Sequence, residues 1–444
     1  MTLLPERARL KRILTLALPI IGGMTSQNVM NLVDTAMVGG LGATALAAVG
    51  LAGFATFFSQ ALLLGLSAGV QAMAARRKGE GRHDDMAHPL NGGLIVAIAA
   101  GVPLSIVLIV LAPTIFPLLV DDGEVARLGT EVWQIRLVAV TAVAMNFCFR
   151  GYWNGVDLSR LYLRTLVVMH VVNIALNYAL IHGRLGAPAL GTAGAAIGTT
   201  VSLFVGTTMY VLLGLRHARA AGFLAHLPDR ETFRKMLRLS IPNGVQQLFF
   251  SAGLTVLFVI VGKIGTDELG AANVLVNIML VGILPGLALG LAAATFVGQA
   301  LGARDVDAAR AWGFDVAKVG GVLLFVIALP FIAFPDLALR AFLHEPHVLE
   351  LARWPLRIVM ATLFIDGIGN VFMNALLGAG DTRRVAGIGI GTQWLFFLPL
   401  AYVVGPVLGY GLSGVWLLNG VWRGAQALIF FSMWRGARWT RIDV

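Results

Sequence analysis

Long apolar segments, separated by short polar or charged connections, dominate this chain. A membrane crossing needs about 20 apolar residues. Twelve segments meet this length: 12–38, 45–74, 89–117, 130–152, 161–183, 191–215, 236–262, 269–301, 311–334, 352–378, 385–408 and 411–434. Backbone polar groups in lipid must be satisfied within their own segment, so each segment is expected to be a helix. The pattern predicts an all-α polytopic membrane protein with twelve transmembrane helices.

Composition supports a membrane protein over the soluble classes. The chain is 58% hydrophobic and 13% charged, with a mean hydropathy of +0.82, whereas soluble domains carry about 25% charged residues. A single cysteine, Cys148, excludes a disulfide scaffold. The first apolar segment follows four basic residues but is too long for a signal peptide, so we expect an uncleaved first span.

The basic residues predict the orientation in the membrane. The net charge of +10 is expected to mark cytoplasmic loops rather than a nucleic-acid surface. With the N-terminus inside, 25 of the 33 Lys and Arg residues fall on the cytoplasmic side and seven, including Arg136, at the outer ends of spans. Arg423 lies in the middle of a span. The split predicts a multi-pass membrane protein with both termini in the cytoplasm.

The two halves of the sequence resemble each other. A shift of 223 residues aligns Pro19 with Pro242, Val38-Gly39 with Val261-Gly262, Gly155 with Gly378 and Arg160 with Arg383. Each half contains six spans, an even number, so both halves have the same orientation. We expect an N-terminal six-helix lobe over 1–217, a cytoplasmic linker over 218–235 and a C-terminal six-helix lobe over 236–444. Such pseudo-symmetric lobes, with a site between them, are typical of rocking transporters.

Polar residues recur at helical spacing inside several spans. They are Gln27, Asn31 and Asp34; His170, Asn173 and Asn177; Gln246 and Gln247; Asn273 and Asn277; and Asp366, Asn370 and Asn374. Polar groups in hydrocarbon are expensive, so such stripes either line a wet cavity or hold helices together through hydrogen bonds. The sequence leaves both interpretations open for the amides.

The two acidic residues well inside spans are the strongest functional candidates. Asp34 lies in the first half and Asp366 in the second. A carboxylate at such a position can exchange a proton, or can hold a monovalent cation such as Na⁺ together with Asn or Thr oxygens. Arg423 can either pair with Asp366 or extend its side chain toward water, and the sequence does not decide between them.

Catalytic and cofactor patterns are missing from the sequence. It has no phosphate-binding loop and no His-Glu-x-x-His pattern. Gly65-Leu66-Ser67-Ala68-Gly69 fits a hydrolase pattern but lies in an apolar helix, so we expect a helix-packing site, as at Gly286/Gly290 and Gly387/Gly391. His182 and His344 are isolated and are not expected to bind a metal. We therefore expect neither an enzyme nor a cofactor.

Four segments of the sequence stand out as motifs: Ala17-Leu18-Pro19, Val33-Asp34-Thr35-Ala36-Met37-Val38-Gly39, Gly151-Tyr152-Trp153-Asn154-Gly155, and Leu377-Gly378-Ala379-Gly380-Asp381-Thr382-Arg383 after Asp366. With these motifs, the chain resembles the multidrug and toxic compound extrusion (MATE) transporters over essentially its whole length. The resemblance implies an antiporter that exports drug-like, often cationic and amphipathic compounds in exchange for H⁺ or Na⁺.

The resemblance implies that Asp34 and Asp366 are coupling carboxylates and that Asn173 is a polar position of the N-terminal lobe. From the polar stripes we expect Asn177 to join them in coupling the ion, and we expect a second group to line the cavity: Gln27, Asn31, Gln246, Gln247, Asn277, Asn370 and Asn374. The family and the predicted orientation together imply a location in the bacterial inner (cytoplasmic) membrane. Asn177 stands where DinF-like members carry a second acid, and Phe249-Phe250-Ser251 lacks the Glu of NorM-like members, so the branch and the coupling ion stay open.

The expected partners are small molecules, chiefly lipophilic cations, and the lipid bilayer, with the chain acting as a monomer. A lipid-linked oligosaccharide flippase of the same superfamily is the alternative function. It is expected to carry cationic residues in its cavity, for which Arg423 is the candidate. A membrane-bound enzyme is the alternative from another class, and it needs a catalytic cluster near the membrane surface.

Overall fold

The computed structural model describes residues 4–343, 345–436 and 438–442, and every regular element in these ranges is a helix. His344 lies outside the described residues. Within these ranges ten helical segments are long and apolar enough to cross a membrane, or eleven if one bent pair counts as a span. A further helix, α16, covers the last predicted span. The all-α polytopic fold predicted from the sequence is confirmed.

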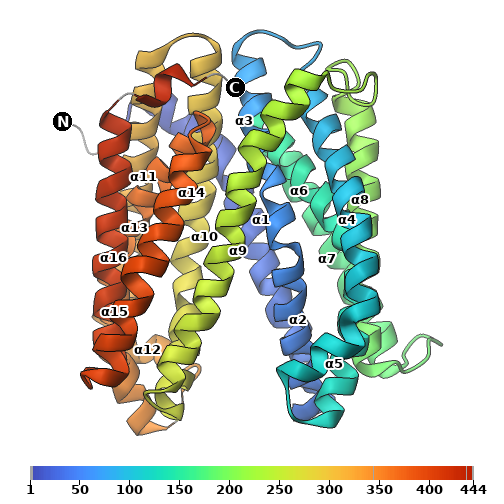
Figure 1. The fold of residues 1–444 in the computed structure, drawn as a ribbon, viewed down its shortest axis with the longest axis vertical. Helices are drawn as coiled ribbons and strands as arrows, with labels where there is room; N and C mark the ends of the chain where they lie inside the picture. Colours follow the sequence, from blue (N-terminus) through green and yellow to red (C-terminus); the bar gives the residue numbers. More distant parts are fainter. Residues whose placement is uncertain (1–3, 344, 437, 443–444) are drawn as a thin grey trace. The chain divides into compact units, whose positions relative to one another are not determined.

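Each predicted span corresponds to one helix or to a pair of consecutive helices (Figure 1). In chain order these are α1 (Arg7–Gly39), α2 (Ala43–Leu64) with α3 (Leu66–Gly79), α4 (His88–Ile115), α5 (Gly123–Leu137) with α6 (Val140–Gly155), α7 (Ser159–His182), α8 (Gly191–His217), α9 (Arg230–Gly262), α10 (Thr266–Gly302), α11 (Val306–Ala333), α13 (Pro346–Gly378), α14 (Thr382–Gly391) with α15 (Leu398–Tyr402), and α16 (Gly411–Arg435). The short α12 (Pro335–Leu339), η1 (Phe116–Leu119) and η4 (Arg438–Arg441) lie between or after them.

The fourth span, predicted over 130–152, is longer than expected and is bent. It begins at Gly123 and bends by 49° between α5 and α6. The early start has a local cause, because the Asp122 carboxylate accepts hydrogen bonds from the backbone N–H groups of Glu124 and Val125 at 2.9 and 3.0 Å. An Asp at this position satisfies N–H groups that the first helical turn leaves without partners.

The eleventh span is also interrupted. Two π-helical segments, η2 (Thr392–Phe397) and η3 (Val403–Val407), flank α15. Pro399 and Pro406 fall in this stretch and lack the N–H group that a regular α-helix needs, which explains why the helix is wound more loosely here.

One compact unit comprises residues 22–78 and 82–244. Within it α7 packs on α8, α2 on α5, and α4 on α6. Gly65 and Gly69 face the first half of α9, where an added Cβ would overlap the backbone of Gly244 or the side chain of Ser240. This confirms the helix-packing role predicted for the Gly65/Gly69 pair.

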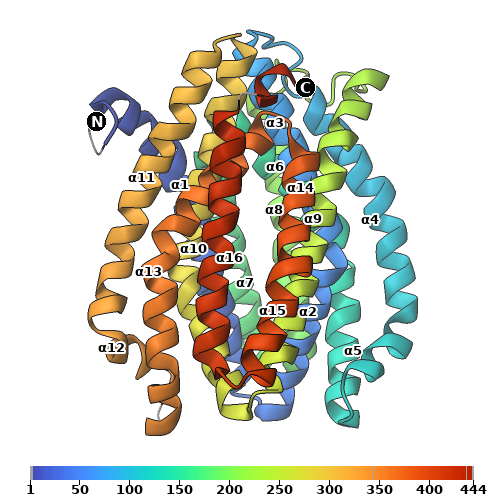
Figure 2. The same ribbon diagram turned by 60° about the vertical axis from the view of Figure 1, so that its left-hand side comes forward.

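The other compact unit comprises residues 1–21, 79–81 and 245–444. Here α13 packs against α10, α11 and α16 (Figure 2), around an apolar core that includes Leu275, Met360 and Trp416. Gly286 and Gly290 face Leu324 and Asn374, as a packing site should. The same prediction was wrong for the Gly387/Gly391 pair, because a Cβ on either glycine would meet no atom within 4 Å.

Two helices change unit part-way along their length. The change falls after Ile21 in α1 and after Gly244 in α9. These positions are 223 residues apart, the shift that relates the two halves of the sequence. The first half of α1 therefore belongs to the same compact unit as the second half of the chain.

The start of α1 and the end of α16 lie beside the same part of α11. Near the start of α1, Arg9 forms a 2.6 Å ion pair with Asp315. Near the end of α16, the ring of Trp434 lies against Gly313. The start of α1 and the end of α16 therefore lie on the same side of this unit.

Candidate functional site

A chain of hydrogen bonds joins Asp34 to the polar stripe of α7. The Asn177 side-chain amide donates to the Asp34 carboxylate at 2.8 Å and to the Asn173 oxygen at 3.2 Å. The amide of Asn173 in turn donates to the Thr199 hydroxyl on α8 at 3.3 Å. Asn173 and Asn177 are four residues apart, so the helix places both side chains on one face. The structure therefore joins α1, α7 and α8 through polar groups inside the membrane region.

Asn177 is the centre of this chain and is fully buried. Its Oδ1 atom has no hydrogen-bond partner among the described residues. Gly198 on α8 faces this oxygen, and any larger side chain there would overlap it. A buried oxygen without a donor is costly, so this atom is positioned to accept a hydrogen bond or to coordinate a cation.

Arg136 was not predicted from the sequence to belong to this site. It was assigned to the outer end of a span, but its guanidinium interacts electrostatically with the Asp34 carboxylate. The side chain extends from α5 toward α2, where its Nη1 lies 3.3 Å from the position of a Cβ on Gly53. Its Nε is enclosed without a hydrogen-bond partner among the described residues. The sequence placed Arg136 near the end of a span, and no pattern in the sequence linked it to Asp34.

The second intramembrane carboxylate has a cationic partner. Asp366 on α13 and Arg423 on α16 form an ion pair of 3.5 Å, with both side chains mostly buried. Arg423 also donates to Gln426 at 3.5 Å and lies 4.6 Å from the centroid of the Trp422 ring. Gln426 then donates to the Thr392 hydroxyl in η2 at 3.0 Å. The choice left open for Arg423 is thereby settled in favour of the ion pair with Asp366.

The other predicted polar residues form shorter contacts. Asn374 donates to the Asn370 oxygen at 2.8 Å, and Asn277 donates to the Asn273 oxygen at 2.9 Å, each within one helix. Gln246 on α9 contacts the Met373 sulfur at 3.8 Å.

The polar residues that precede Asp34 on α1 are exposed. Gln27 approaches Asn31 at 3.5 Å within the same helix. Gln247 on α9 is half-buried. One turn before Asn173, the His170 ring lies 3.1 Å from the Ser26 hydroxyl, which adds a second polar contact between α1 and α7.

Comparisons with known proteins identify the family. The family model MatE matches residues 19–179 and 242–403, two matches that begin 223 residues apart. A protein named probable multidrug resistance protein NorM from Thermotoga maritima is 26% identical over 436 residues, covering 95% of this chain and 92% of that protein. One of the same name from Burkholderia pseudomallei is 30% identical over 443 residues, covering 95% and 91%.

A solved structure agrees with the fold. It is described as the outward-facing conformation of a multidrug resistance MATE family transporter of the MOP superfamily. Its TM-score is 0.89 at 23% identity, and the match covers 96% of this chain and 95% of that one. The resemblance and the fold predicted from the sequence are both confirmed, and the chain belongs to the MatE family of membrane transporters.

Proposed function

We propose that this protein is an antiporter that exports drug-like, cationic amphipathic compounds in exchange for H⁺ or Na⁺, with Asp34 as the principal coupling carboxylate. The names of its relatives refer to multidrug resistance. The observation that carries the proposal is the hydrogen-bond chain from Asp34 through Asn177 and Asn173 to Thr199. These hydrogen bonds connect the ionisable side chain of Asp34 on α1 to α7 and α8.

The proposed switch depends on whether Asp34 is charged. An ionised carboxylate in the membrane needs donors, and the Asn177 amide supplies one at 2.8 Å. A bound proton or Na⁺ neutralises the carboxylate, which weakens that demand and lets α1 repack against α7. Pro19 interrupts the hydrogen bonding of α1 and is the proposed flexing point. Ion loading and drug holding then favour different conformations, so each ligand expels the other.

Arg136 supplies the counter-charge in this scheme. Its electrostatic interaction with Asp34 is favourable while the carboxylate is ionised and is lost once a proton or Na⁺ neutralises it. A bound proton or Na⁺ thus competes with the Arg136 guanidinium for the Asp34 carboxylate. For Na⁺, the oxygen of Asn177 that faces Gly198 is an additional ligand close to the carboxylate.

The pairing of Asp366 with Arg423 supports a cationic cargo over a lipid-linked pyrophosphate. A flippase for such an anion needs free positive charge in its cavity. Arg423 was the candidate for that role, but it is compensated by Asp366 at 3.5 Å. Asp366 ranks below Asp34 as a coupling group for the same reason.

We further propose the inner-membrane location, the cytoplasmic termini and a monomeric functional unit. Cysteine labelling tests the topology. The one native cysteine, Cys148, is buried, so it should give little background. A cysteine introduced at Arg82, in the connection before α4, should react with a membrane-impermeant reagent only after the cells are opened. Labelling of intact cells from outside would overturn the orientation.

Vesicles containing the purified protein test the transport function. A pH gradient and a sodium gradient are imposed separately, and the movement of ethidium is followed by fluorescence. At least one gradient should drive ethidium transport above the rate in protein-free vesicles. If neither gradient moves any member of a panel of lipophilic cations, while a lipid-linked pyrophosphate crosses the bilayer, the flippase replaces the antiporter.

A further inference from the structure

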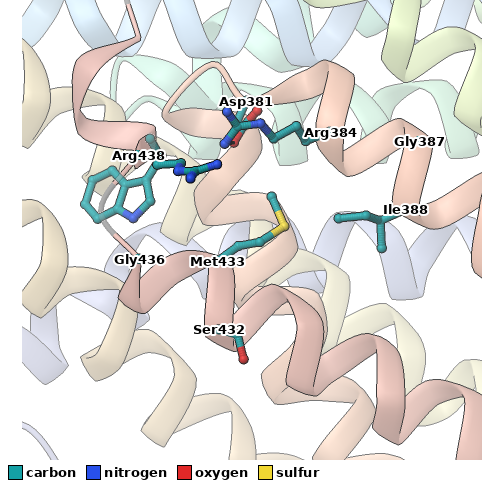
Figure 3. A pocket seen from close by; sticks show the side chains of 9 residues that line it. Asp381, Arg384, Gly387, Ile388, Ser432, Met433, Gly436 and Arg438 are labelled. Atoms are coloured by element: carbon teal, nitrogen blue, oxygen red, sulfur yellow. Dashed lines mark hydrogen bonds and ion pairs between the residues drawn. The ribbon is translucent and has the colours of Figure 1, made fainter.

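An open cavity lies where α14 begins and α16 ends, far along the chain from Asp34. Its volume is about 580 Å³, and it is lined by Asp381, Arg384, Gly387, Ile388, Ser432, Met433, Gly436, Arg438 and Trp439 (Figure 3). This volume falls within the range of about 300 to 1,000 Å³ that is common for small-molecule sites. All of the lining residues belong to the same compact unit.

Two arginines and one carboxylate define the electrostatics of the cavity. Arg384 comes from α14 and Arg438 from η4, and Figure 3 shows both guanidinium groups turned toward the same region beside Asp381. Asp381 pairs with Arg384 at 3.4 Å. Among the described residues, the Arg438 side chain has no hydrogen bond or ion pair. One positive charge therefore faces the cavity without compensation.

Arg438 is held by a rigid support. The next residue, Trp439, is buried and stacks on Trp434 with the ring centroids 4.0 Å apart and the planes at 2°. The Trp439 indole also donates a hydrogen bond to the Trp434 carbonyl at 2.7 Å. These contacts hold η4 against the end of α16, which places the backbone of Arg438 beside the cavity and lowers the entropic cost of binding there.

Apart from Ser432, the remainder of the cavity is lined by apolar residues and glycines. Ile388 and Met433 form its wall, and Gly387 leaves the space beside them open because a Cβ there would meet no atom within 4 Å. α14 begins at Thr382 and α16 ends at Arg435, so the cavity lies at the depth where membrane spans meet water. Lipid phosphates occupy that depth, and acyl chains lie below it.

We propose that this cavity binds the phosphate group of an anionic glycerophospholipid, with Arg384 and Arg438 on the phosphate and an acyl chain along Ile388 and Met433. Guanidinium groups bind phosphate oxygens through paired, charge-assisted hydrogen bonds, which makes two converging arginines a suitable site. This site is separate from the coupling site, so its failure would leave the proposed transport function untouched.

Native mass spectrometry of the full-length protein tests the proposal. The protein is released from micelles that contain either phosphatidylglycerol or phosphatidylcholine, and the lipid molecules retained per protein are counted. Gly387→Leu fills the cavity without changing its charge, and Gly391→Leu is its matched control on the same helix, because this glycine also faces open space and does not line the cavity. Arg438→Gln removes the unpaired charge, and Arg441→Gln removes a charge from the same short helix outside the cavity.

The wild type should retain phosphatidylglycerol in preference to phosphatidylcholine. Arg438→Gln should weaken that retention about fivefold, the factor expected for one basic residue at an anionic lipid surface. Gly387→Leu should abolish the preference, whereas both control variants should keep it. Equal retention by Gly387→Leu and Gly391→Leu would overturn the site. Displacement of the lipid by inorganic phosphate at equal concentration would overturn the assignment to a lipid and leave a free-phosphate site.

Discussion

Replacement of Gly198 by alanine perturbs the Asp34 site without altering any polar residue. The new methyl group would overlap Oδ1 of Asn177 and would lie 3.2 Å from its Cγ and 3.3 Å from its backbone nitrogen. The amide can relieve this overlap only by rotating. Rotation moves the same amide away from Asp34, to which it donates at 2.8 Å. The variant therefore removes the central hydrogen bond of the proposed switch.

The energetic cost follows from the contacts that are lost. A hydrogen bond to a charged group contributes about 1.5 to 3 kcal/mol, and overpacking a filled core costs about 1 to 3 kcal/mol. Alanine regains roughly 1 kcal/mol through its higher helix propensity. The net destabilisation should be about 3 kcal/mol. If the hydrogen bond forms in only one of the transport conformations, its loss alone should slow ion-driven export about 10- to 100-fold.

The assay combines thermal unfolding in detergent with ion-driven ethidium export from vesicles. Gly50→Ala on α2 is the matched control, because a Cβ at that position would meet no atom within 4 Å. It should unfold at or above the wild-type temperature and should transport normally. Native stability and native transport in Gly198→Ala would refute the inference that Asn177 must donate to Asp34.

Three further predictions concern ion pairs. Arg423→Gln should destabilise the protein by about 3 kcal/mol, because it leaves a mostly buried carboxylate unpaired. The double variant with Asp366→Asn should be destabilised by less than the sum of the two single effects. Thermal unfolding of the wild type, both single variants and the double variant measures this difference. Burial raises the pKa of Asp381 above its ordinary value of 3.8, and the nearby positive charge of Arg384 offsets part of this increase. The folded state therefore holds this proton more tightly than the unfolded chain, so the unfolding temperature of the wild type relative to Asp381→Asn should fall as the pH rises from about 3 to 7; a constant difference would contradict the raised pKa. Arg9→Gln loses both the ion pair to Asp315 and the stacking on Trp312 at 4.1 Å, and should lower stability by about 1 to 2 kcal/mol in the same unfolding assay.

The helical fold could be predicted from the sequence because hydrocarbon allows few alternatives. Each apolar segment of sufficient length became a helix, and the shift of 223 residues between the halves reappears in the two matches of the family model. Local chemistry added features to two spans that the sequence did not predict. Asp122 starts the fourth span early, and prolines loosen the eleventh. Such effects depend on single hydrogen bonds, which hydropathy alone does not register.

The candidate site could be predicted only in part. Asp34, Asn173 and Asn177 were identified because polar groups inside spans are rare and their spacing is helical. Arg136 was missed, because its interaction with Asp34 joins two helices that no pattern in the sequence relates. The same limit applied to Gly198, whose importance comes from the atom that it faces and not from its own chemistry.

If Asp34 couples the ion gradient to export, a side chain at this position that cannot ionise must abolish gradient-driven transport. Asp34→Asn keeps the size of the side chain and its capacity for hydrogen bonds but cannot bind or release a proton as a carboxylate does. Asp121→Asn, at an exposed acid between η1 and α5, is the control. The rate of ethidium export driven by an imposed ion gradient is measured in vesicles with equal amounts of folded protein. Gradient-driven export should be lost in Asp34→Asn and unchanged in Asp121→Asn. Native rates in Asp34→Asn would instead show that Asp34 only joins α1 to α7 and that coupling occurs elsewhere.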